Sequence, residues 1–472
     1  MLTDAVGHGL FALFSLPDSE FRGCHGYAVL VESVLAYVVG ILVVVIGVAI
    51  SIALHEIGHL VPAKLFGVRV GQYMIGFGRT IFSFRRGETE YGIKALPLGG
   101  YISMAGMFPP LKSGGGARNA STGFFQTLVQ DARSASADTI TPGEDDRSFY
   151  RLPVYKRVII MCGGPFMNLV IAFVLFAVVL TGFGIQQLST TIGSVNACLL
   201  PAGSERQTCG PGDPAAPGAE AGLKPGDTIV SINGTAIDDW EQASTLIRNS
   251  AGTPLEIGLR RDGSNHTVSA TPVRTQWYVY DDNGTVRKNA DGTPVTEDIG
   301  MLGIGSAYEL TRQPLGAVAP MVGNNIVQVS NIVLHLPQRM IDVANAAFGP
   351  AERDPNGPVG LIGVGRMAGE ISSINTIPVA ERASALISVV ASVNVALLVF
   401  NLIPLMPLDG GHIAGALWEG LRRSFAKLFK RKDPGPVDTA RLVPLTFAVV
   451  VVLGAMSLLL AYADIVKPIS IF

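Results

Sequence analysis

Long apolar stretches alternate with polar segments along this chain. Four stretches contain no Asp, Glu, Lys or Arg: residues 34–54, 158–185, 385–408 and 442–463. Each is long enough for a helix that crosses the hydrocarbon core of a membrane, which takes roughly 20 residues. Buried helices of a soluble protein are an alternative for one such run but a poor explanation of four. The pattern therefore predicts an α-helical membrane protein with about four transmembrane helices.

Between the first two stretches, the pattern changes to one typical of strands. Segments 68–75, 81–84 and 90–95 are separated by turns rich in Gly and Arg. Residues 62–110 are therefore predicted to form a membrane-associated β-hairpin or small sheet. An ordinary cytoplasmic hairpin is the alternative, because backbone outside a helix is tolerated at membrane depth only where it is buried or lines a cavity.

Composition supplies the remaining boundaries. A Gly-, Ser-, Ala- and Asp-rich segment is predicted to be a flexible insertion, and the pattern at 316–349 favours an amphipathic helix on the outer leaflet. The predicted order is an N-terminal extracytoplasmic segment 1–33, helix 34–61, β region 62–110, cytoplasmic insertion 111–155, helix 156–185, β-rich domain 190–306, amphipathic helix and loop 316–381, helix 383–411, cytoplasmic basic loop 412–441 and helix 442–464.

Charge gives the predicted orientation. Residues 62–157 hold 13 Lys and Arg against 7 Asp and Glu, residues 413–441 hold 7 against 3, and residues 186–381 hold 12 against 20. Basic segments next to spans stay in the cytoplasm, so both termini and residues 186–381 are predicted to lie outside it, in a multi-pass protein of the cell membrane. A net charge of −2 argues against nucleic acid as a partner.

A metal-binding pattern ends the first stretch, where the sequence reads His55-Glu56-Ile57-Gly58-His59. Residues i and i+4 of a helix share a face, so both histidines can bind one metal ion. Glu56 lies beside that ion, where it can take a proton from an attacking water. A charged cluster at the membrane edge is the alternative, although ionisable residues inside a span are costly and usually functional.

Catalytic zinc sites commonly use three protein ligands, and Asp409 is the candidate for the third. It stands in Leu408-Asp409-Gly410-Gly411-His412, where the third stretch ends. The first and third spans cross in the same direction, so Glu56 and Asp409 are predicted to reach the same membrane face. Two alternatives remain: Asp409 as a turn residue before the two glycines, and His412 as the ligand in its place.

These motifs resemble the signatures of the site-2 protease family, a family of intramembrane zinc metalloproteases. The residues are His-Glu-Ile-Gly-His at 55–59, Asn-x-x-Pro-x-x-x-Leu-Asp-Gly-Gly at 401–411, and Gly164-Pro-Phe-Met-Asn168, which is similar to the Gly-x-x-x-Asn motif of the family's second core helix. They occur in the family's order, and the resemblance covers essentially the whole chain. It is closest to the bacterial group that contains the regulator of sigma-E protease.

The resemblance implies that His55, His59 and Asp409 bind Zn²⁺ and that Glu56 is the general base. It also implies that Asn401 and Asn168 hold substrate or the oxyanion, to which a buried amide can donate a hydrogen bond. For Asn168, a hydrogen bond between helices is an equal alternative. The implied substrates are transmembrane segments of single-span proteins, such as anti-sigma factors, cut near the cytoplasmic face.

Glycines near these motifs have predicted roles of their own. Gly163 and Gly164 are expected to allow close approach of two helices. In the family, a sheet like that predicted at 62–110 pairs with an unwound substrate segment, and protease substrates are generally bound extended. Gly76 and Gly78 would permit close approach of another backbone, so both are candidate substrate-binding residues.

Residues 221–234 resemble the central hairpin of bacterial PDZ domains, with turns at Pro225-Gly226 and Asn233-Gly234. Residues 190–306 are therefore predicted to be one PDZ-like domain, where the best-known bacterial members have two. Asp227 is interpreted as a turn residue. Cys198 and Cys209 lie in this domain, and an oxidising compartment would permit a disulfide that sequence alone leaves open.

Two other classes of function stay open on sequence grounds. A transporter would use intramembrane His and Asp as an ion path, but it predicts two repeated halves, and the sequence contains no internal repeat. A catalytically inactive scaffold would present the PDZ-like domain, but it would have no need for Glu56 between the ligands. The sequence therefore favours a zinc-dependent intramembrane endopeptidase.

Overall fold

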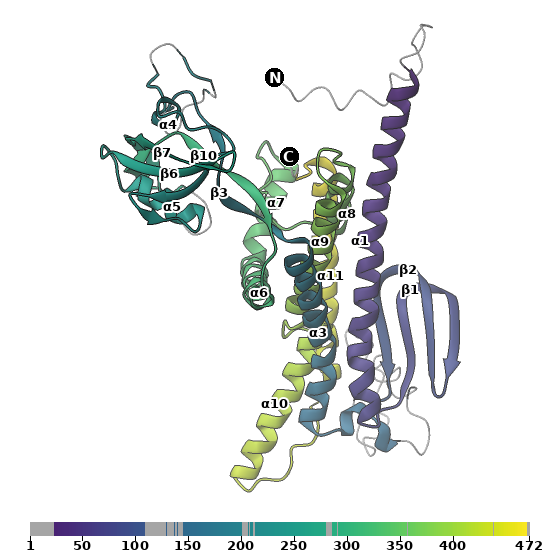
Figure 1. The fold of residues 1–472 in the computed structure, drawn as a ribbon. Coiled ribbons are helices and arrows are strands. Elements are labelled where there is room, and N and C mark those ends of the chain that lie inside the picture. The colour runs from purple at the N-terminus through teal and green to yellow at the C-terminus, as the bar shows by residue number, and fades with distance from the viewer. Residues whose placement is uncertain are drawn as a thin grey trace. The chain divides into compact units, whose positions relative to one another are not determined.

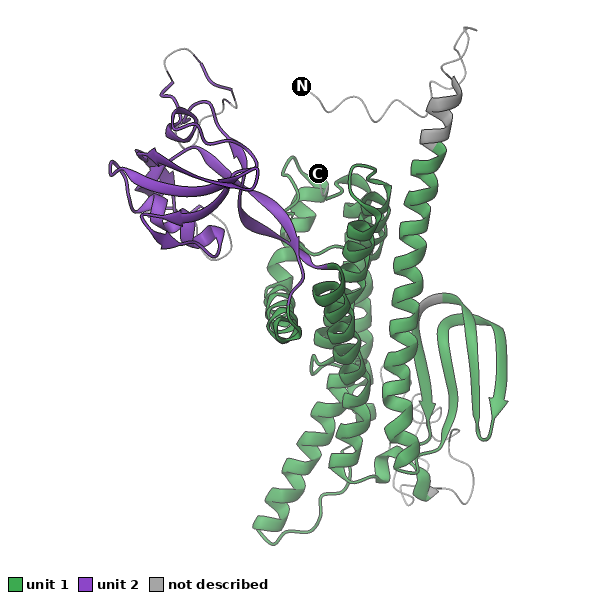
Figure 2. Ribbon diagram, in the orientation of Figure 1, with its two compact units in different colours: residues 1–183, 314–472 green, residues 184–313 purple. Residues whose placement is uncertain are grey.

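The computed structural model describes residues 23–108, 145–200, 208–210, 213–279, 286–289, 291–355, 357–437 and 439–469, and the single positions 129, 136, 139 and 206. The chain divides into two compact units, residues 1–183 with 314–472 and residues 184–313 (Figure 2). The predictions for residues 1–22, and for most of 111–144, lie outside the described residues.

The first unit is built mainly of helices (Figure 1). They are α1 Gly23–Leu65, α3 Val154–Ala177, α6 Val318–Leu334, α7 Leu336–Phe348, α8 Leu361–Ser373, α9 Val379–Asn401, α10 Asp409–Leu428 and α11 Val443–Val466, with short helical turns η1 Asp145–Arg147, η2 Phe149–Arg151, η3 Val178–Phe183, η4 Leu315–Ala317 and η5 Thr439–Leu442. With 43 residues, α1 is roughly 64 Å long, about twice the thickness of a hydrocarbon core.

Five helices in the described part of the chain are long and apolar enough to cross a membrane, one more than the sequence predicts. They cover Val31–Leu65, Val154–Phe183, Leu315–Leu334, Val379–Asn401 and Thr439–Val466. The additional candidate, Leu315–Leu334, is the least apolar of the five. It includes α6, which Figure 1 shows nearly end-on while α3, α9 and α11 run up the page, so α6 crosses their direction. The predicted amphipathic helix at 316–349 is divided near Pro337 into α6 and α7.

The third predicted span differs from the observed helix in its C-terminal boundary. The sequence predicts a helix over 383–411 and a basic loop over 412–441, whereas α9 ends at Asn401 and α10 begins at Asp409. Two prolines, Pro404 and Pro407, fall in the intervening turn, and proline interrupts a helix because it lacks a backbone N–H. Asp409 therefore opens a new helix instead of ending the span.

Two long bent strands, β1 Val70–Arg86 and β2 Thr89–Met104, form the small sheet that the sequence predicts at 62–110. Residues 70–75 of β1 pair on one side with 100–104 of β2 and on the other with 90–93, and residues 82–86 pair with 89–93. The pairings of 70–75 with 100–104 and of 82–86 with 89–93 are antiparallel, whereas 70–75 and 90–93 run in the same direction. Within the described residues, the segment 100–104 is therefore an edge of a four-segment sheet.

The second unit is rich in strands, as predicted for 190–306. Its elements are β3 Ile185–Val195, α4 Pro217–Glu220, β4 Thr228–Ile232, β5 Thr235–Ala236, α5 Trp240–Arg248, β6 Leu255–Arg261, β7 Ser264–Ala270, β8 Val273–Tyr278, β9 Thr296–Met301 and β10 Ile304–Thr311. Six strands form one sheet in the order β10-β3-β4-β6-β7, with β5 beside β4, and β8 pairs with β9. Buried aliphatic residues such as Ile229, Ile257 and Leu259 form its core.

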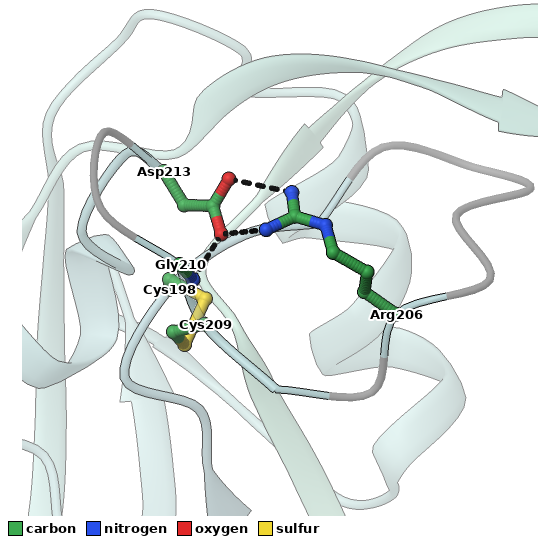
Figure 3. The surroundings of a disulfide bond; sticks show 5 residues. All are labelled: Cys198, Arg206, Cys209, Gly210 and Asp213. Carbon is green, nitrogen blue, oxygen red and sulfur yellow. Dashed lines mark hydrogen bonds and ion pairs between the residues drawn. A yellow bond between two sulfur atoms is a disulfide. The ribbon is translucent and has the colours of Figure 1, made fainter.

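Cys198 and Cys209 form a disulfide, with their Cα atoms 5.9 Å apart (Figure 3). Beside it, Arg206 pairs with Asp213 at 2.9 Å, and Asp213 accepts a hydrogen bond from the backbone N–H of Gly210. The question that the sequence leaves open for the two cysteines is thus answered by their geometry.

Asp227 is a turn residue, as expected. Its carboxylate accepts a hydrogen bond of 2.8 Å from the backbone N–H of Lys224 and forms an ion pair of 2.6 Å with Arg261. Asp227 is 1% exposed. The Arg261 guanidinium holds the pKa of this carboxyl below its usual value.

Candidate metal centre

The His-Glu-x-x-His pattern lies near the C-terminal end of α1 and folds as the spacing predicts. His55 and His59 are one helical turn apart on the same face, and their side chains contact each other with ring centroids 4.9 Å apart. The three polar positions of the motif are buried: His55 and Glu56 are each 9% exposed and His59 is 4% exposed. An apolar span thus carries a compact polar cluster that needs partners from other elements.

Glycines bring α3 against this part of α1. A Cβ atom added to Gly58 would overlap the backbone of Gly163, and one added to Gly163 would overlap the carbonyl of Gly58. Small residues allow helix backbones in a membrane to approach closely. The expectation that Gly163 and Gly164 permit close helix approach is confirmed.

Gly164 faces the two imidazoles directly. A Cβ atom there would lie 2.6 Å from Nε2 of His55 and would also overlap Nε2 of His59. Those nitrogens are the atoms turned toward Asp409, so glycine at 164 keeps the space beside both potential ligand atoms free. The first residue of the Gly-x-x-x-Asn motif therefore has a steric role at the site itself.

Three potential ligand atoms converge at this point. Nε2 of His55 and Nε2 of His59 are 3.2 Å apart, and each lies 3.3 Å from Oδ2 of Asp409. Donor atoms around a tetrahedral zinc ion with bonds of about 2.0–2.1 Å are separated by roughly 3.3 Å. Oδ2 of Asp409 is buried and makes no hydrogen bond. The three atoms therefore have the spacing and the unsatisfied charge that suit a zinc ion.

The other ring nitrogen of each histidine has its own partner. Nδ1 of His59 lies 2.8 Å from the carbonyl oxygen of Ile160, to which it can donate its proton. Nδ1 of His55 lies 3.0 Å from the side-chain amide of Asn168, whose Oδ1 is otherwise unpartnered. Turning this amide by 180° makes Oδ1 the acceptor of an Nδ1 proton. Both histidines can then present a free Nε2 lone pair to a metal.

Asp409 reaches the histidines because a tight turn precedes α10. Residues 402–408 form a series of turns between α9 and α10, and Gly410 and Gly411 in the first turn of α10 pack against them. A Cβ atom on Gly411 would lie 2.6 Å from the backbone nitrogen of Met406. The two glycines therefore serve close packing at the start of a helix. His412 lies one turn further along α10, beside Arg157 and Glu419 and outside the three-ligand group.

The edge of the small sheet passes next to Glu56. A Cβ atom on Gly100 would lie 2.9 Å from Cγ of Glu56 and 3.1 Å from Cγ2 of Ile52. The hydroxyl of Tyr73, on the adjacent strand, donates a hydrogen bond of 2.8 Å to the carbonyl of Ala53. The sheet is thus held against α1, with its edge segment 100–104 beside the candidate base.

The candidate substrate-binding residues occupy three different places. Asn168 lies at the metal centre, and Asn401 is half-buried at the end of α9, before the turn to Asp409. Gly76 and Gly78 lie in β1 with φ of +91° and +84°, which favours glycine at both. A Cβ on Gly76 would also lie 2.6 Å from the carbonyl oxygen of Leu96. Packing within the sheet therefore explains Gly76, and its role toward substrate stays a prediction.

Two buried polar contacts were not predicted from the sequence. Asn394 of α9, which is fully buried, donates a hydrogen bond of 2.9 Å to Oγ of Ser51, one turn from His55 on α1. Arg157 of α3 pairs with Glu419 of α10 at 2.6 Å. A polar residue inside an apolar stretch is the signal for Asn394 and Ser51. The Arg157–Glu419 pair joins residues 262 positions apart and had no such signal.

Comparison with known proteins gives a consistent result. Residues 43–432 match the family described as peptidase family M50. The chain is 30% identical over 449 residues to the zinc metalloprotease Rip1 of Mycobacterium tuberculosis, covering 93% of this chain and 100% of the relative. It is 31% identical to the protein of that name from Mycolicibacterium smegmatis, covering 92% and 99%. The metalloprotease MmpA of Caulobacter vibrioides is 26% identical, with 79% and 85% covered.

Proposed function

Because the chain belongs to peptidase family M50, we propose that it is a zinc-dependent endopeptidase that cuts peptide bonds inside the membrane. The observation that carries this proposal is the group formed by His55, His59 and Asp409, whose ligand atoms are 3.2–3.3 Å apart near the C-terminal end of an apolar helix. Apolar packing would stabilise a membrane span at a lower free-energy cost than these ionisable residues. A metal site inside a span therefore indicates a functional role and not a structural one.

The proposed ligands are Nε2 of His55, Nε2 of His59 and Oδ2 of Asp409. A bound zinc ion supplies Lewis acidity, which polarises the scissile carbonyl and makes water a stronger acid. Glu56 accepts the proton that the attacking water loses and passes it to the leaving nitrogen, so that the carboxylate is regenerated at the end. The protein backbone at Gly164 leaves open space on the α3 side of the ligand atoms.

Asn401 is proposed to stabilise the oxyanion or to hold substrate. It lies at the end of α9, eight positions before Asp409, and its side chain is half-buried. An amide near the metal centre can donate to the oxygen on which negative charge develops. For Asn168, the contact with His55 favours orientation of a ligand, and a direct contact with substrate is the alternative function that we keep.

The proposed substrates are transmembrane segments of single-span proteins, with anti-sigma factors as the expected class. A helical segment hides its carbonyls in its own hydrogen bonds, so it must unwind locally before it can be cut. The edge 100–104 supports this step, because an unwound segment can add to it as a strand beside Glu56. Gly76 and Gly78 are proposed to help admit this segment.

The proposed orientation places the metal centre near the cytoplasmic face and the second unit outside the cytoplasm, in the cell membrane. The distribution of Lys and Arg supports it, and so does the disulfide of the second unit, because disulfides persist in oxidising compartments. We propose that this unit is a PDZ-like domain that binds or sorts substrates. Prior removal of a substrate's outer domain would then allow access to the active site.

Purified full-length protein and a single-span reporter substrate test the proposal. Glu56→Gln should abolish cleavage while bound zinc, measured by mass spectrometry, stays at one equivalent. Glu352→Gln, an exposed residue, is the matched control and should cleave like the parent protein. Absence of zinc from the parent protein together with absence of cleavage would refute the proposal and favour a transporter or a scaffold.

A further inference from the structure

The C-terminal half of α10 exposes a stripe of large apolar side chains. Trp418, Leu421, Phe425 and Leu428 follow one another at helical spacing, and they are 56%, 47%, 52% and 73% exposed. Phe429, 64% exposed, stacks on Phe425 with a ring-centroid distance of 6.5 Å. Soluble surfaces scatter such residues singly, so this continuous stripe needs an apolar environment to cover it.

Cationic side chains border the stripe on the same helix and on the chain that follows. They are Arg422, Arg423, Lys427, Lys430, Arg431 and Lys432. Few acids oppose them: Glu419 is fully buried and pairs with Arg157 and Arg423, and Asp433 lies 3.6 Å from Arg423. The region consequently presents a surplus of positive charge next to aromatic rings.

A groove of about 310 Å³ combines both features. Its walls include the rings of Trp418, Phe425 and Phe429 and the cationic side chains of Arg431 and Lys432. An amphipathic helix with aromatic and aliphatic residues on one face and Lys or Arg beside them is typical of membrane interfaces. The rings suit the region where acyl chains begin, and the cations suit phosphate groups.

The place of α10 in the fold agrees with such an environment. It connects α9 to α11, which are both candidate spans, so the chain leaves and re-enters the membrane on the same side. Figure 1 shows the C-terminal end of α10 near the level at which α1 ends and α3 begins. Lys64 and Lys156 stand at those helix ends, where basic residues mark the boundary between membrane and water.

We propose that residues 418–432 bind anionic phospholipid headgroups at the membrane surface, with the aromatic stripe inserted among the acyl chains. A protein partner would cover the stripe equally well, but the surplus of cations and the spans on both sides favour the lipid surface. Anionic headgroups attract clustered Lys and Arg within about 10 Å. The inference concerns a surface away from the metal centre and does not depend on the proposed peptidase activity.

The chain offers a direct probe. It has three tryptophans, at 240, 277 and 418, and the first two lie in the second unit. Full-length protein with Trp240→Phe and Trp277→Phe therefore reports on Trp418 alone. It is reconstituted in bilayer discs of mixed phosphatidylglycerol and phosphatidylcholine, in which either one lipid or the other carries brominated acyl chains that quench nearby tryptophan.

At fixed composition, we expect brominated phosphatidylglycerol to quench Trp418 about three times as strongly as brominated phosphatidylcholine. The preference should weaken as salt is raised, because screening reduces attraction to headgroups. The variant with Arg422→Gln, Lys427→Gln, Lys430→Gln and Lys432→Gln should quench equally with both lipids. A control that removes as many charges from the second unit, with Lys224→Gln, Arg248→Gln, Arg260→Gln and Lys288→Gln, should keep the preference.

Three results would overturn the inference. Equal quenching by the two lipids in the parent protein would show apolar insertion without headgroup selection. Loss of the preference in the control would trace it to net charge instead of residues 418–432. Absence of quenching by either lipid would place Trp418 outside the bilayer and indicate a protein partner for the stripe.

Discussion

The two units of the molecule differ in the kind of packing that stabilises each of them internally. In the second unit, large aliphatic side chains such as Ile257 and Leu259 are fully buried, and charged residues lie mostly at the surface. In the first unit, large apolar side chains of α1 and α11 face outward, for example Leu42 and Val451, which are 52% and 53% exposed. A close contact between its helices α1 and α3 joins Gly58 to Gly163.

This difference explains why the first unit buries more polar groups than the second. Lipid covers apolar side chains as well as a protein core does, so the helices of a membrane protein gain little from burying them against each other. Glycine contacts and paired polar groups then supply the packing. The first unit accordingly buries His59, Asn168, Asn394 and the Arg157–Glu419 pair, whereas the second unit buries Asp227 with one arginine at its edge.

The largest effect is expected from adding a methyl group at the α1–α3 contact. Gly164→Ala would push a Cβ atom into both imidazoles, so zinc binding should be lost and cleavage should fall by about a hundredfold or more. Gly182→Ala adds the same methyl group to α3's π-helical extension, where nothing lies within 4 Å, and should have no effect. Zinc content and reporter cleavage measure both. Full zinc binding by Gly164→Ala would contradict the packing that we describe.

The second effect concerns the buried pair between α3 and α10. Glu419→Leu leaves the buried Arg157 guanidinium without its partner and should lower the free energy of unfolding by about 3–5 kcal/mol, whereas Arg157→Met leaves Glu419 its pair with Arg423 and should cost less. The double variant leaves neither charge and should recover much of this loss. Unfolding by a denaturing detergent measures the three variants. If each single variant were as stable as the parent, this pair would not hold the two helices together.

A smaller effect is expected where a polar partner orients a ligand. Asn168→Leu removes the acceptor for Nδ1 of His55 and should weaken zinc binding about 10–100-fold, as measured by competition with a chelator. Asn168→Asp keeps an acceptor oxygen and should bind zinc nearly as well as the parent. Equal losses in the two variants would indicate that Asn168 acts in another way, such as direct contact with substrate.

The smallest effect belongs to the second unit and depends on pH. The ion pair with Arg261 lowers the pKa of Asp227 in the folded protein, so as the pH falls the unfolded chain takes up this proton first. The stabilisation, about 1–2 kcal/mol, is complete at neutral pH and is lost below about pH 4. Asp227→Asn should lower stability at pH 7 and flatten its decline toward pH 3.

This prediction can be tested by thermal unfolding of protein that carries Trp418→Phe, with the tryptophan signal as the readout. The two remaining tryptophans, Trp240 and Trp277, both lie in the second unit and therefore report on that unit. Arg274→Gln is a suitable control, since its pair with Asp298 is long, at 3.6 Å, and exposed. If the stability of Asp227→Asn declined more steeply with acid than that of the parent protein, the result would contradict the stabilising effect expected of the ion pair.

Sequence reasoning predicted the metal centre because two independent patterns converge there. The spacing of His55 and His59 requires a shared helix face, and the parity of the spans places Asp409 on the same side of the membrane. The structure brings these residues together, while their chemical roles stay predictions. The family relationship and the peptidase class that the motifs imply are confirmed by comparison with known proteins.

Features that depend on contacts between distant segments could not be predicted in this way. The sequence predicted a loop for the basic residues at 422–432, although residues 422–428 lie on α10, where the cations border an apolar stripe. Gly410 and Gly411 suggested the end of a helix, because their need for close packing against residues 402–406 is invisible in a linear pattern. The pairing of Arg157 with Glu419 could not be predicted because the two residues are 262 positions apart and neither lies in a recognisable motif.

The proposed addition of substrate to the edge segment 100–104 has a consequence for substrate choice. A strand that adds to an edge is recognised through its peptide groups, which every residue carries, so recognition there reads little of the substrate's side chains. Sites of cleavage should then share no consensus sequence. Susceptibility would depend instead on how cheaply a membrane helix unwinds, and helix-weakening glycine or proline in an otherwise unrelated segment would mark it for cutting.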